Sequence, residues 1–457
     1  GGRSSGAGLL AVLRSIKHFF LLDQGDVLVS IMEVADEELC KPAKAINRTR
    51  LQSLLEMAVK MSSAAADPHA DSLGYEMDPR SLESLVKAAA VAAAVATASP
   101  ARPDGSTASS LPGAPDSPYA TPTARGCPGF RGAAGAGGRP LPPHTPGGSR
   151  LLGPRDQDLP GWELYLPTLK LDWPATLVVG GEELLQYQML FKHLWGLKRV
   201  ERQLEATWLL LQGTKRLARA GSALSPQAAA RRQKQMAVAH ALCQQLHFTV
   251  QELLRYGTLD VLEPLWNCLE EGVMQRAADV DQVIELHRDF LRRATAGLLL
   301  DQPRALRCMI TLQQSAAGFA RHVSALWDRL QAGVETSSKA TQVTAADIAA
   351  EQQRAAQLAA ALDDLQRLMG EATAQVQALV AAVRDHYERL MTGGANVGGA
   401  GAAGGLGAGA SPGGAVAELP ESGGWDLEAL QNLADRLDFG RPAAGTLGAV
   451  LAEMVRG

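Results

Sequence analysis

The sequence predicts an all-α protein made of helical bundles, with at most a small β-hairpin. Apolar residues recur at steps of three and four over several long segments, which is the spacing of one helix face. Only the segment 162–179 alternates apolar and polar residues as a strand does. Of the 457 residues, 46% are hydrophobic and 20% are charged, a balance typical of a chain that folds around a core.

The first helical block runs from Leu9 to about Lys60. Pro42 and the segment 47–49 interrupt its pattern and are expected to separate two helices. Asn47 or Thr49 can cap the second helix, because a side-chain oxygen at this position accepts a hydrogen bond from the first turn. The expected buried face of that helix consists of Leu51, Leu54, Leu55, Ala58 and Met61.

Short strands are expected between Trp162 and Val179. The alternating apolar residues there are Leu164, Leu166, Leu169, Leu171 and Trp173. Pro167 and Pro174 confine such strands to an edge or a turn, because proline has no N–H to donate to a ladder.

Later segments carry the strongest helical pattern. A long helix is expected to begin near Gly180, and others to cover about 226–255, 280–300, 358–390 and 427–437. The apolar stripe of the first contains Tyr187, Leu190, Leu194, Leu197, Val200, Leu204, Trp208 and Leu211. Its members from Tyr187 to Leu194, with Phe191, should be core. The segment 358–390 is nearly heptadic, with Leu358, Leu362, Leu365, Met369, Ala372, Val376, Leu379, Val383 and Leu390.

Three compositional breaks divide the chain. Residues 99–160 are rich in Pro, Gly, Ala and Ser, and residues 392–424 form a Gly/Ala tract. Such segments bury too little apolar surface to offset their ordering entropy, so we expect disordered insertions there. A softer, polar and turn-like break is expected around 333–346.

The charge balance argues against a nucleic-acid binder. Lys and Arg total 44 and Asp and Glu total 48, so the formal charge is −4 and no basic surplus exists. The five cysteines include no C-x-x-C pair, which favours a reducing cytosolic compartment. The longest uncharged apolar run, 88–98, is about half a membrane span. We therefore expect a soluble, intracellular protein without a membrane span, and the absence of an initial Met suggests a fragment.

Motifs for catalysis or cofactor binding are weak. A G-x-G-x-x-G sequence at Gly399, Gly401 and Gly404 lies within the Gly/Ala tract, with no strand before it, so we expect no cofactor. His287 lies near Glu285, but its neighbours in the helical stripe are apolar, which favours a buried, hydrogen-bonded histidine over a catalytic pair. The sequence therefore predicts no enzyme.

One constellation has metal-ligand spacing. His240, Cys243 and His247 lie at i, i+3 and i+7, on one face of a helix, and imidazole with thiolate suits zinc. The same stripe contains Met236 and Val250, and no fourth ligand is indicated. Core packing is therefore the better interpretation, and no metal site is predicted.

Charged positions offer two interpretations. Lys198, Arg199 and Arg202 can meet an acidic partner, or they can form the solvated face of an amphipathic helix. The pairs 37–38 and 182–183, all glutamates, are interpreted as ordinary helix-start or surface charges.

Several stretches together resemble one family. The segment 18–39 reads HFFLLDQGDVLVSIMEVADEEL and is followed by a Leu-rich helix from Arg50. The segment 184–204 reads LLQYQMLFKHLWGLKRVERQL, with Asp-Trp-Pro at 172–174 just before it. Weaker matches occur at 259–265 and 283–291, and the last is Arg-Leu-Asp-Phe at 436–439. In this order they resemble the gamma-tubulin complex component family.

The resemblance implies a scaffold and not an enzyme. It implies that residues 1–48 end an N-terminal domain for lateral assembly and that 49–457 form a C-terminal domain that binds gamma-tubulin. The implied partners are gamma-tubulin and sibling components, among them component 3, and the implied location is the cytoplasm, the cytoskeleton and microtubule organising centres such as centrosomes, basal bodies or spindle poles. The implied role is to position gamma-tubulin for microtubule nucleation at minus ends.

Contact residues are expected at exposed or motif positions. These are Lys198, Arg199, Arg202, Arg436 and Asp438. After Phe439 the chain continues with Gly-Arg-Pro-Ala-Ala, where the family usually has a polar residue and then aromatics, so the last contact can differ here. The alternative function is a helical tethering adaptor unrelated to tubulin, which would self-associate through the heptads at 358–390.

Overall fold

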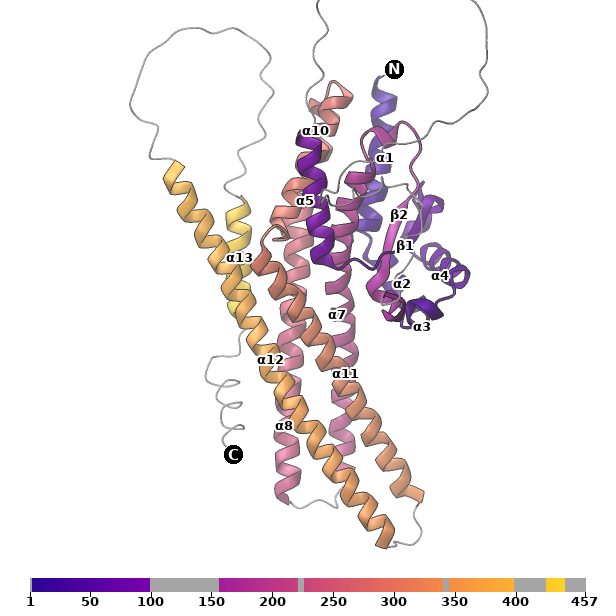
Figure 1. Ribbon diagram of the computed structural model, residues 1–457, viewed down its shortest axis with the longest axis vertical. Coiled ribbons are helices and arrows are strands. Elements are labelled where there is room, and N and C mark those ends of the chain that lie inside the picture. Colours follow the sequence, from indigo (N-terminus) through magenta and orange to yellow (C-terminus); the bar gives the residue numbers. More distant parts are fainter. Residues whose placement is uncertain (1, 99–155, 221–225, 340–344, 398–424, 440–457) are drawn as a thin grey trace, which may run out of the picture.

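The protein is an elongated helical bundle that carries one small sheet (Figure 1). The computed structural model describes residues 2–98, 156–220, 226–339, 345–397 and 425–439. The helices that precede the second strand in the chain are α1 (Gly2–Phe20), α2 (Gly25–Val34), α3 (Asp36–Leu39), α4 (Arg48–Met61), α5 (Leu82–Ala98) and α6 (Gly161–Leu164). Those that follow are α7 (Gly181–Ala220), α8 (Pro226–Arg255), α9 (Glu263–Glu271), α10 (Val280–Gly297), α11 (Pro303–Lys339), α12 (Ala345–Val397) and α13 (Trp425–Phe439). The strands are β1 (Leu73–Met77) and β2 (Tyr165–Leu169).

Four long helices form the length of the bundle. Helix α7 packs on α8 and α11, and α11 packs on α12 (Figure 1). The all-α prediction is confirmed, and the expected helices 226–255 and 280–300 match α8 and α10 within a few residues. None of the helices in the described ranges is both long and apolar enough to cross a membrane.

The heptad seam of α12 is buried inside this chain. Its residues Leu365, Met369, Ala372, Val376, Leu379 and Val383 are at most 2% exposed. Helix α12 packs against α11, α8 and α13. The prediction fails at Leu390, which is 41% exposed, while the side chains of Leu358 and Leu362 lie outside the described set. The seam therefore has partners already, and they are helices of the same molecule.

The sheet joins segments on both sides of residues 99–155. β1 pairs antiparallel with β2, and Tyr75 lies opposite Pro167. One strand within 162–179 is confirmed, and its partner, 73–77, lies outside that segment. Leu171 and Trp173 lie beyond the strand, and Trp173 is 76% exposed.

Pro167 fits the ladder because of its register. The N–H of Asp78 donates to the carbonyl of Leu164 (2.8 Å), and the N–H of Lys170 donates to that of Ser72 (3.0 Å). Hydrogen-bonded pairs alternate with non-hydrogen-bonded pairs in an antiparallel ladder. Pro167 therefore occupies a non-hydrogen-bonded position, where its missing N–H removes no ladder bond.

The N-terminal block contains more helices than expected. Three helices, α1 to α3, precede Pro42, and Leu22 adopts φ 62° in the turn between α1 and α2. The Asn47 cap is confirmed, since its side chain accepts a hydrogen bond from the N–H of Arg50 (3.1 Å). Leu51, Leu55 and Ala58 are buried as predicted, but Met61, at the last turn of α4, is 69% exposed.

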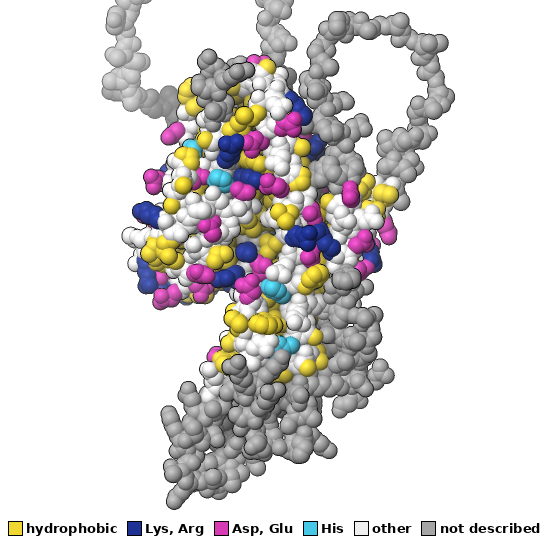
Figure 2. Space-filling model, turned by 180° about the vertical axis from the view of Figure 1, so that it is seen from behind, with side chains coloured by type: hydrophobic (Ala, Val, Ile, Leu, Met, Phe, Trp, Pro, Cys, Tyr) yellow, Lys and Arg dark blue, Asp and Glu magenta, His cyan; other side chains and the backbone are white. Residues whose placement is uncertain are grey.

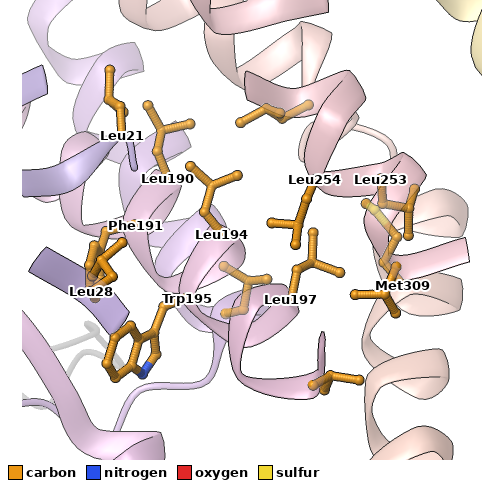
Figure 3. Close-up of a cluster of buried hydrophobic side chains, with 14 of the residues drawn as sticks. Leu21, Leu28, Leu190, Phe191, Leu194, Trp195, Leu197, Leu253, Leu254 and Met309 are labelled. Atoms are coloured by element: carbon orange, nitrogen blue, oxygen red, sulfur yellow. The ribbon is translucent and has the colours of Figure 1, made fainter. Parts of the chain in front are cut away.

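Helix α7 is packed on two sides (Figure 3). Leu190, Phe191 and Leu194 are at most 1% exposed, which confirms the predicted core stripe, together with Tyr187. Leu21, just after α1, and Leu28 of α2 lie on one side of α7, and Leu253, Leu254 and Met309 from α8 and α11 lie on the other.

One ring joins the N-terminal helices directly to α7. Phe20, at the end of α1, makes edge-to-face contacts with Tyr187 (centroids 6.1 Å apart) and Phe191 (6.3 Å). The N-terminal helices and the long bundle therefore share one core.

The expected insertions lie mostly outside the described residues, which exclude 99–155 and 398–424. Their edges are helical or anchored. Residues 392–397 belong to α12, and Leu159 accepts a hydrogen bond from the N–H of Ala43 (2.9 Å). The break expected at 333–346 is also shorter, because α11 continues to Lys339 and α12 begins at Ala345.

Two of the glutamates interpreted as helix-start or surface charges are buried, and one of them acts at a helix start. Glu38 is 1% exposed and accepts hydrogen bonds from Lys41 Nζ (2.6 Å) and the N–H of Asn47 (2.8 Å). The hydrogen bond from Lys41 lowers the pKa of Glu38, against the opposing effect of burial. Glu183 accepts from the N–H of Gly180 (3.0 Å), so it caps the start of α7 from its third position.

Candidate functional site

The cations predicted on α7 are engaged within the chain. The guanidinium of Arg199 lies over the ring of Trp162 (5.2 Å to the centroid). Burial lowers the pKa of Arg199. A cation against an aromatic face is worth about 0.5–1 kcal/mol at an exposed site and more when desolvated. Arg199 therefore binds α7 to α6.

Lys198 and Arg202 are also paired. Lys198 Nζ lies 2.6 Å from Glu201 Oε2 on the same helix. Arg202 lies 2.8 Å from Glu33 Oε1 of α2 and 3.5 Å from Glu205 Oε2. The three cations are half-buried, and Arg199 and Arg202 hold α7 against neighbouring elements.

The motif residues of α13 are engaged in the same way. Arg436 Nε lies 3.2 Å from Glu252 Oε2 of α8, and its guanidinium also pairs with Asp260. Asp260 belongs to a π-helical turn, η6 (Tyr256–Leu262). Asp438 pairs with Arg384 of α12. Arg436 and Asp438 therefore fix α13 to three different elements.

Replacing Arg436 by alanine should release α13. The side chain of Glu252 is 12% exposed and that of Asp260 is 27% exposed, so both would lose a cation in a partly desolvated site. We expect a loss of about 1–3 kcal/mol, more than an exposed ion pair contributes. Hydrogen exchange in 425–439 should become faster. Arg367→Ala, which breaks an exposed pair with Asp364, is the matched control, and unchanged exchange in α13 would contradict the role of Arg436.

The constellation of His240, Cys243 and His247 is a packing seam, as preferred above. His240 Nε2 lies 3.1 Å from the carbonyl of Leu211, and Cys243 Sγ lies 3.5 Å from that of Leu204. Burial raises the pKa of Cys243 to about 12, so it is a neutral thiol and a poor metal ligand at pH 7.

His247 faces two carboxylates of α7 instead. Among the described residues, only one group of three or more His, Cys, Asp or Glu side chains has all its possible ligand atoms within 4.8 Å of one another. It consists of Glu201, Glu205 and His247. Lys198 already pairs with Glu201, and Arg202 with Glu205. These cations neutralise both carboxylates, so the group fits an ion-pair network better than a metal centre.

His287 is a buried structural histidine, which confirms its preferred interpretation. Its Nε2 lies 2.8 Å from the hydroxyl oxygen of Tyr187, and the side chain is fully buried. Burial lowers the pKa of His287 to about 4. Glu285 is exposed on the same helix, so the two do not form a buried acid–base pair.

Exposed apolar side chains were missed by the sequence pattern. Trp208, placed in the apolar stripe of α7, is 39% exposed, and its neighbour Leu209 is 65% exposed. Four residues along a helix turn by about 40° more than one full turn, so Trp208 lies beside the line from Leu204 to Leu211. On the face in Figure 2, acidic and basic side chains are interspersed, without one dominant sign.

A groove also lies between α4 and the sheet. It has a volume of about 520 Å³ and is lined on one side by α4, from Arg48 to Glu56, and on the other by Tyr75, Glu76 and Met77 of β1. No sequence pattern indicated it, because β1 was not predicted and the groove exists only once β1 is paired.

The chain matches known proteins over most of its length. The family model for the gamma tubulin complex component C-terminal region matches residues 9–441. Gamma-tubulin complex component 2 of Mus musculus is 30% identical over 312 residues, covering 68% of this chain and 28% of the relative. Component 2 of Arabidopsis thaliana is 28% identical over 312 residues, covering 68% and 36%.

The spindle pole body component alp4 of Schizosaccharomyces pombe is 27% identical over 323 residues, covering 70% of this chain and 38% of the relative. The chain thus spans roughly a third of the length of these relatives. The family match runs through the N-terminal helices, the sheet, the long bundle and α13 without leaving out any of them. The chain therefore belongs to the gamma-tubulin complex component family.

Proposed function

We propose that this chain is a scaffold subunit of a gamma-tubulin complex, and that it binds gamma-tubulin and positions it for microtubule nucleation at minus ends. The match of the family model over residues 9–441 carries this proposal. Relatives named as gamma-tubulin complex components and spindle pole body components support it. The corresponding location is the cytoskeleton at microtubule organising centres.

The proposed mechanism is positional. A bundle whose long helices share one continuous core holds a bound partner at a fixed height and angle. Fixing several partners side by side raises their effective concentration and removes part of the entropy cost of lateral contacts. Sibling components, component 3 among them, would stand beside this chain. Residues 1–48 would end the lateral-assembly domain, and 49–457 would bind gamma-tubulin.

We propose no catalytic role for the chain. His287 and Cys243 are buried in the neutral form, and any bound nucleotide would belong to gamma-tubulin. Four of the five predicted contact residues would act on binding mainly by holding α7 and α13 in place, because each already has an ion pair or ring contact with another element: Arg199, Arg202, Arg436 and Asp438. Lys198 is paired within α7.

A titration with purified gamma-tubulin tests the proposal. The immobilised chain should bind gamma-tubulin saturably, and a double charge reversal at Arg199 and Arg202 should weaken binding if those cations position α7. Lys170→Glu, at an exposed position beyond β2, is the matched charge control. Circular dichroism checks that each variant is folded. A folded parent chain that fails to bind gamma-tubulin would refute the proposed function.

A further inference from the structure

The outer edge of β1 has unpaired backbone groups. The hydrogen bonds at Asp78 and Ser72 place the hydrogen-bonded pairs of the ladder at even-numbered residues of β1. The N–H and C=O of Tyr75 and Met77 therefore point away from β2. Within the described residues, neither backbone has another hydrogen-bond partner.

That edge faces the groove of about 520 Å³ and not another element of the sheet. Helix α4 lies across the groove and turns its apolar face, with Leu51 and Leu55, toward α2. The residues of α4 that line the groove are all polar: Arg48, Thr49, Gln52, Ser53 and Glu56. The hydroxyl of Tyr75 donates to the carbonyl of Arg48 (2.9 Å), which fixes the distance between the two walls near the start of α4.

We propose that this groove binds an extended peptide segment of a partner protein, which adds to β1 as a third strand. An extended backbone presents N–H and C=O groups at the two-residue spacing that the edge of β1 requires. A helix satisfies these groups internally and cannot pair with them. The five residues of β1 give an edge of roughly 16 Å, enough for a short segment.

The charged side chains that line the groove determine which charges a bound peptide should carry. Glu56 of α4 and Glu76 of β1 line the groove, with Arg48 at the other end of the α4 wall. A matching segment carries a Lys or Arg side chain toward Glu56 and Glu76. Side chains on one face of a strand recur every second residue, so this pattern is readable in a bound sequence.

Hydrogen exchange of the chain alone tests the open edge. Resolved to single amides, exchange should be fast at Tyr75 and at least tenfold slower at Gly74 and Glu76, which the ladder protects. Strong protection of Tyr75 in the isolated chain would mean that the chain covers its own edge, and it would overturn the proposal of a partner segment.

Panning tests the ligand class. A phage-displayed library of random 12-residue peptides is selected on the full chain, and the enriched peptides are titrated against variants. Tyr75→Pro removes the outward N–H and should weaken binding tenfold or more, whereas Tyr75→Phe keeps the N–H, loses only the hydroxyl contact with Arg48 and should bind more tightly than Tyr75→Pro. Glu76→Lys should weaken basic peptides, with Glu285→Lys on α10 as the charge control.

Each result decides the matter. Peptides that protect the Tyr75 amide and lose affinity with Tyr75→Pro and Glu76→Lys support strand addition. If no enriched peptide distinguishes these variants from the parent, or if the bound peptides are helical, the proposal is wrong. Thermal melts by circular dichroism confirm folding, and Glu76→Lys serves alone if Tyr75→Pro is unfolded.

Discussion

Replacing Phe20 by alanine should lower the free energy of unfolding by about 3–5 kcal/mol, the usual effect of truncating a buried aromatic residue. Phe20 is fully buried and contacts the rings of Tyr187 and Phe191. Its removal leaves a cavity between α1 and α7, and neither helix can close it alone because both are held by other contacts.

Urea denaturation followed by circular dichroism and by tryptophan fluorescence measures this loss. Met61→Ala, at a side chain 69% exposed, is the control and should change stability by less than about 0.5 kcal/mol. Because Phe20 joins the N-terminal helices to the bundle, the two probes should give one coincident transition. A loss below 1 kcal/mol, or a separate early transition of α1 alone, would contradict the shared core.

Replacing His287 by glutamine should flatten the acid side of the stability curve. Burial lowers the pKa of His287 to about 4, from 6.5 for the unperturbed group. The charge of Glu183 and the backbone of Val178 raise this pKa by smaller amounts, and the charge of Arg288 lowers it slightly further. Between these pH values the unfolded chain binds the proton and the folded chain does not, so stability falls as the pH falls. The loss between pH 7 and pH 4 is roughly 3 kcal/mol.

The measurement compares the parent and His287→Gln by urea denaturation at several pH values. The stability difference between them should shift by roughly 3 kcal/mol in favour of the variant as the pH falls from 7 to 4. Tyr187→Phe removes the hydroxyl but leaves the imidazole buried, so it should keep the parental pH dependence. Parallel curves for the parent and His287→Gln would show that His287 is not the group that titrates.

The long helices could be predicted because their patterns are locally complete. The apolar stripes of α7 and α8, with residues at steps of three and four, span many turns, and the glycines at 180–181 mark the start of α7. β1 could not be predicted in this way. Its five residues include Gly74 and Glu76, and it is a strand because β2 pairs with it from 88 residues farther along the chain.

The contacts of the candidate site were harder to predict from the sequence than β1. Arg199 and Arg202 are typical of a solvated helix face, and only the packed structure reveals that Trp162 and Glu33 lie against them. Glu38 looks like a helix-start charge until Lys41 and the N–H of Asn47 are seen to enclose it. Such partners come from other elements, so spacing along one element does not contain them.

The position of Pro167 determines how the sheet can grow. Its ring nitrogen has no hydrogen to donate on the outer side of β2, and its carbonyl accepts a hydrogen bond from Gln188 of α7 (3.2 Å). The outer edge of β2 therefore cannot pair with another strand, and the sheet can be extended only at the edge of β1. A sheet with a single open border takes up at most one strand per molecule and cannot serve as a link in an unlimited chain of copies, so this fold is protected against fibrous self-assembly through its β-structure.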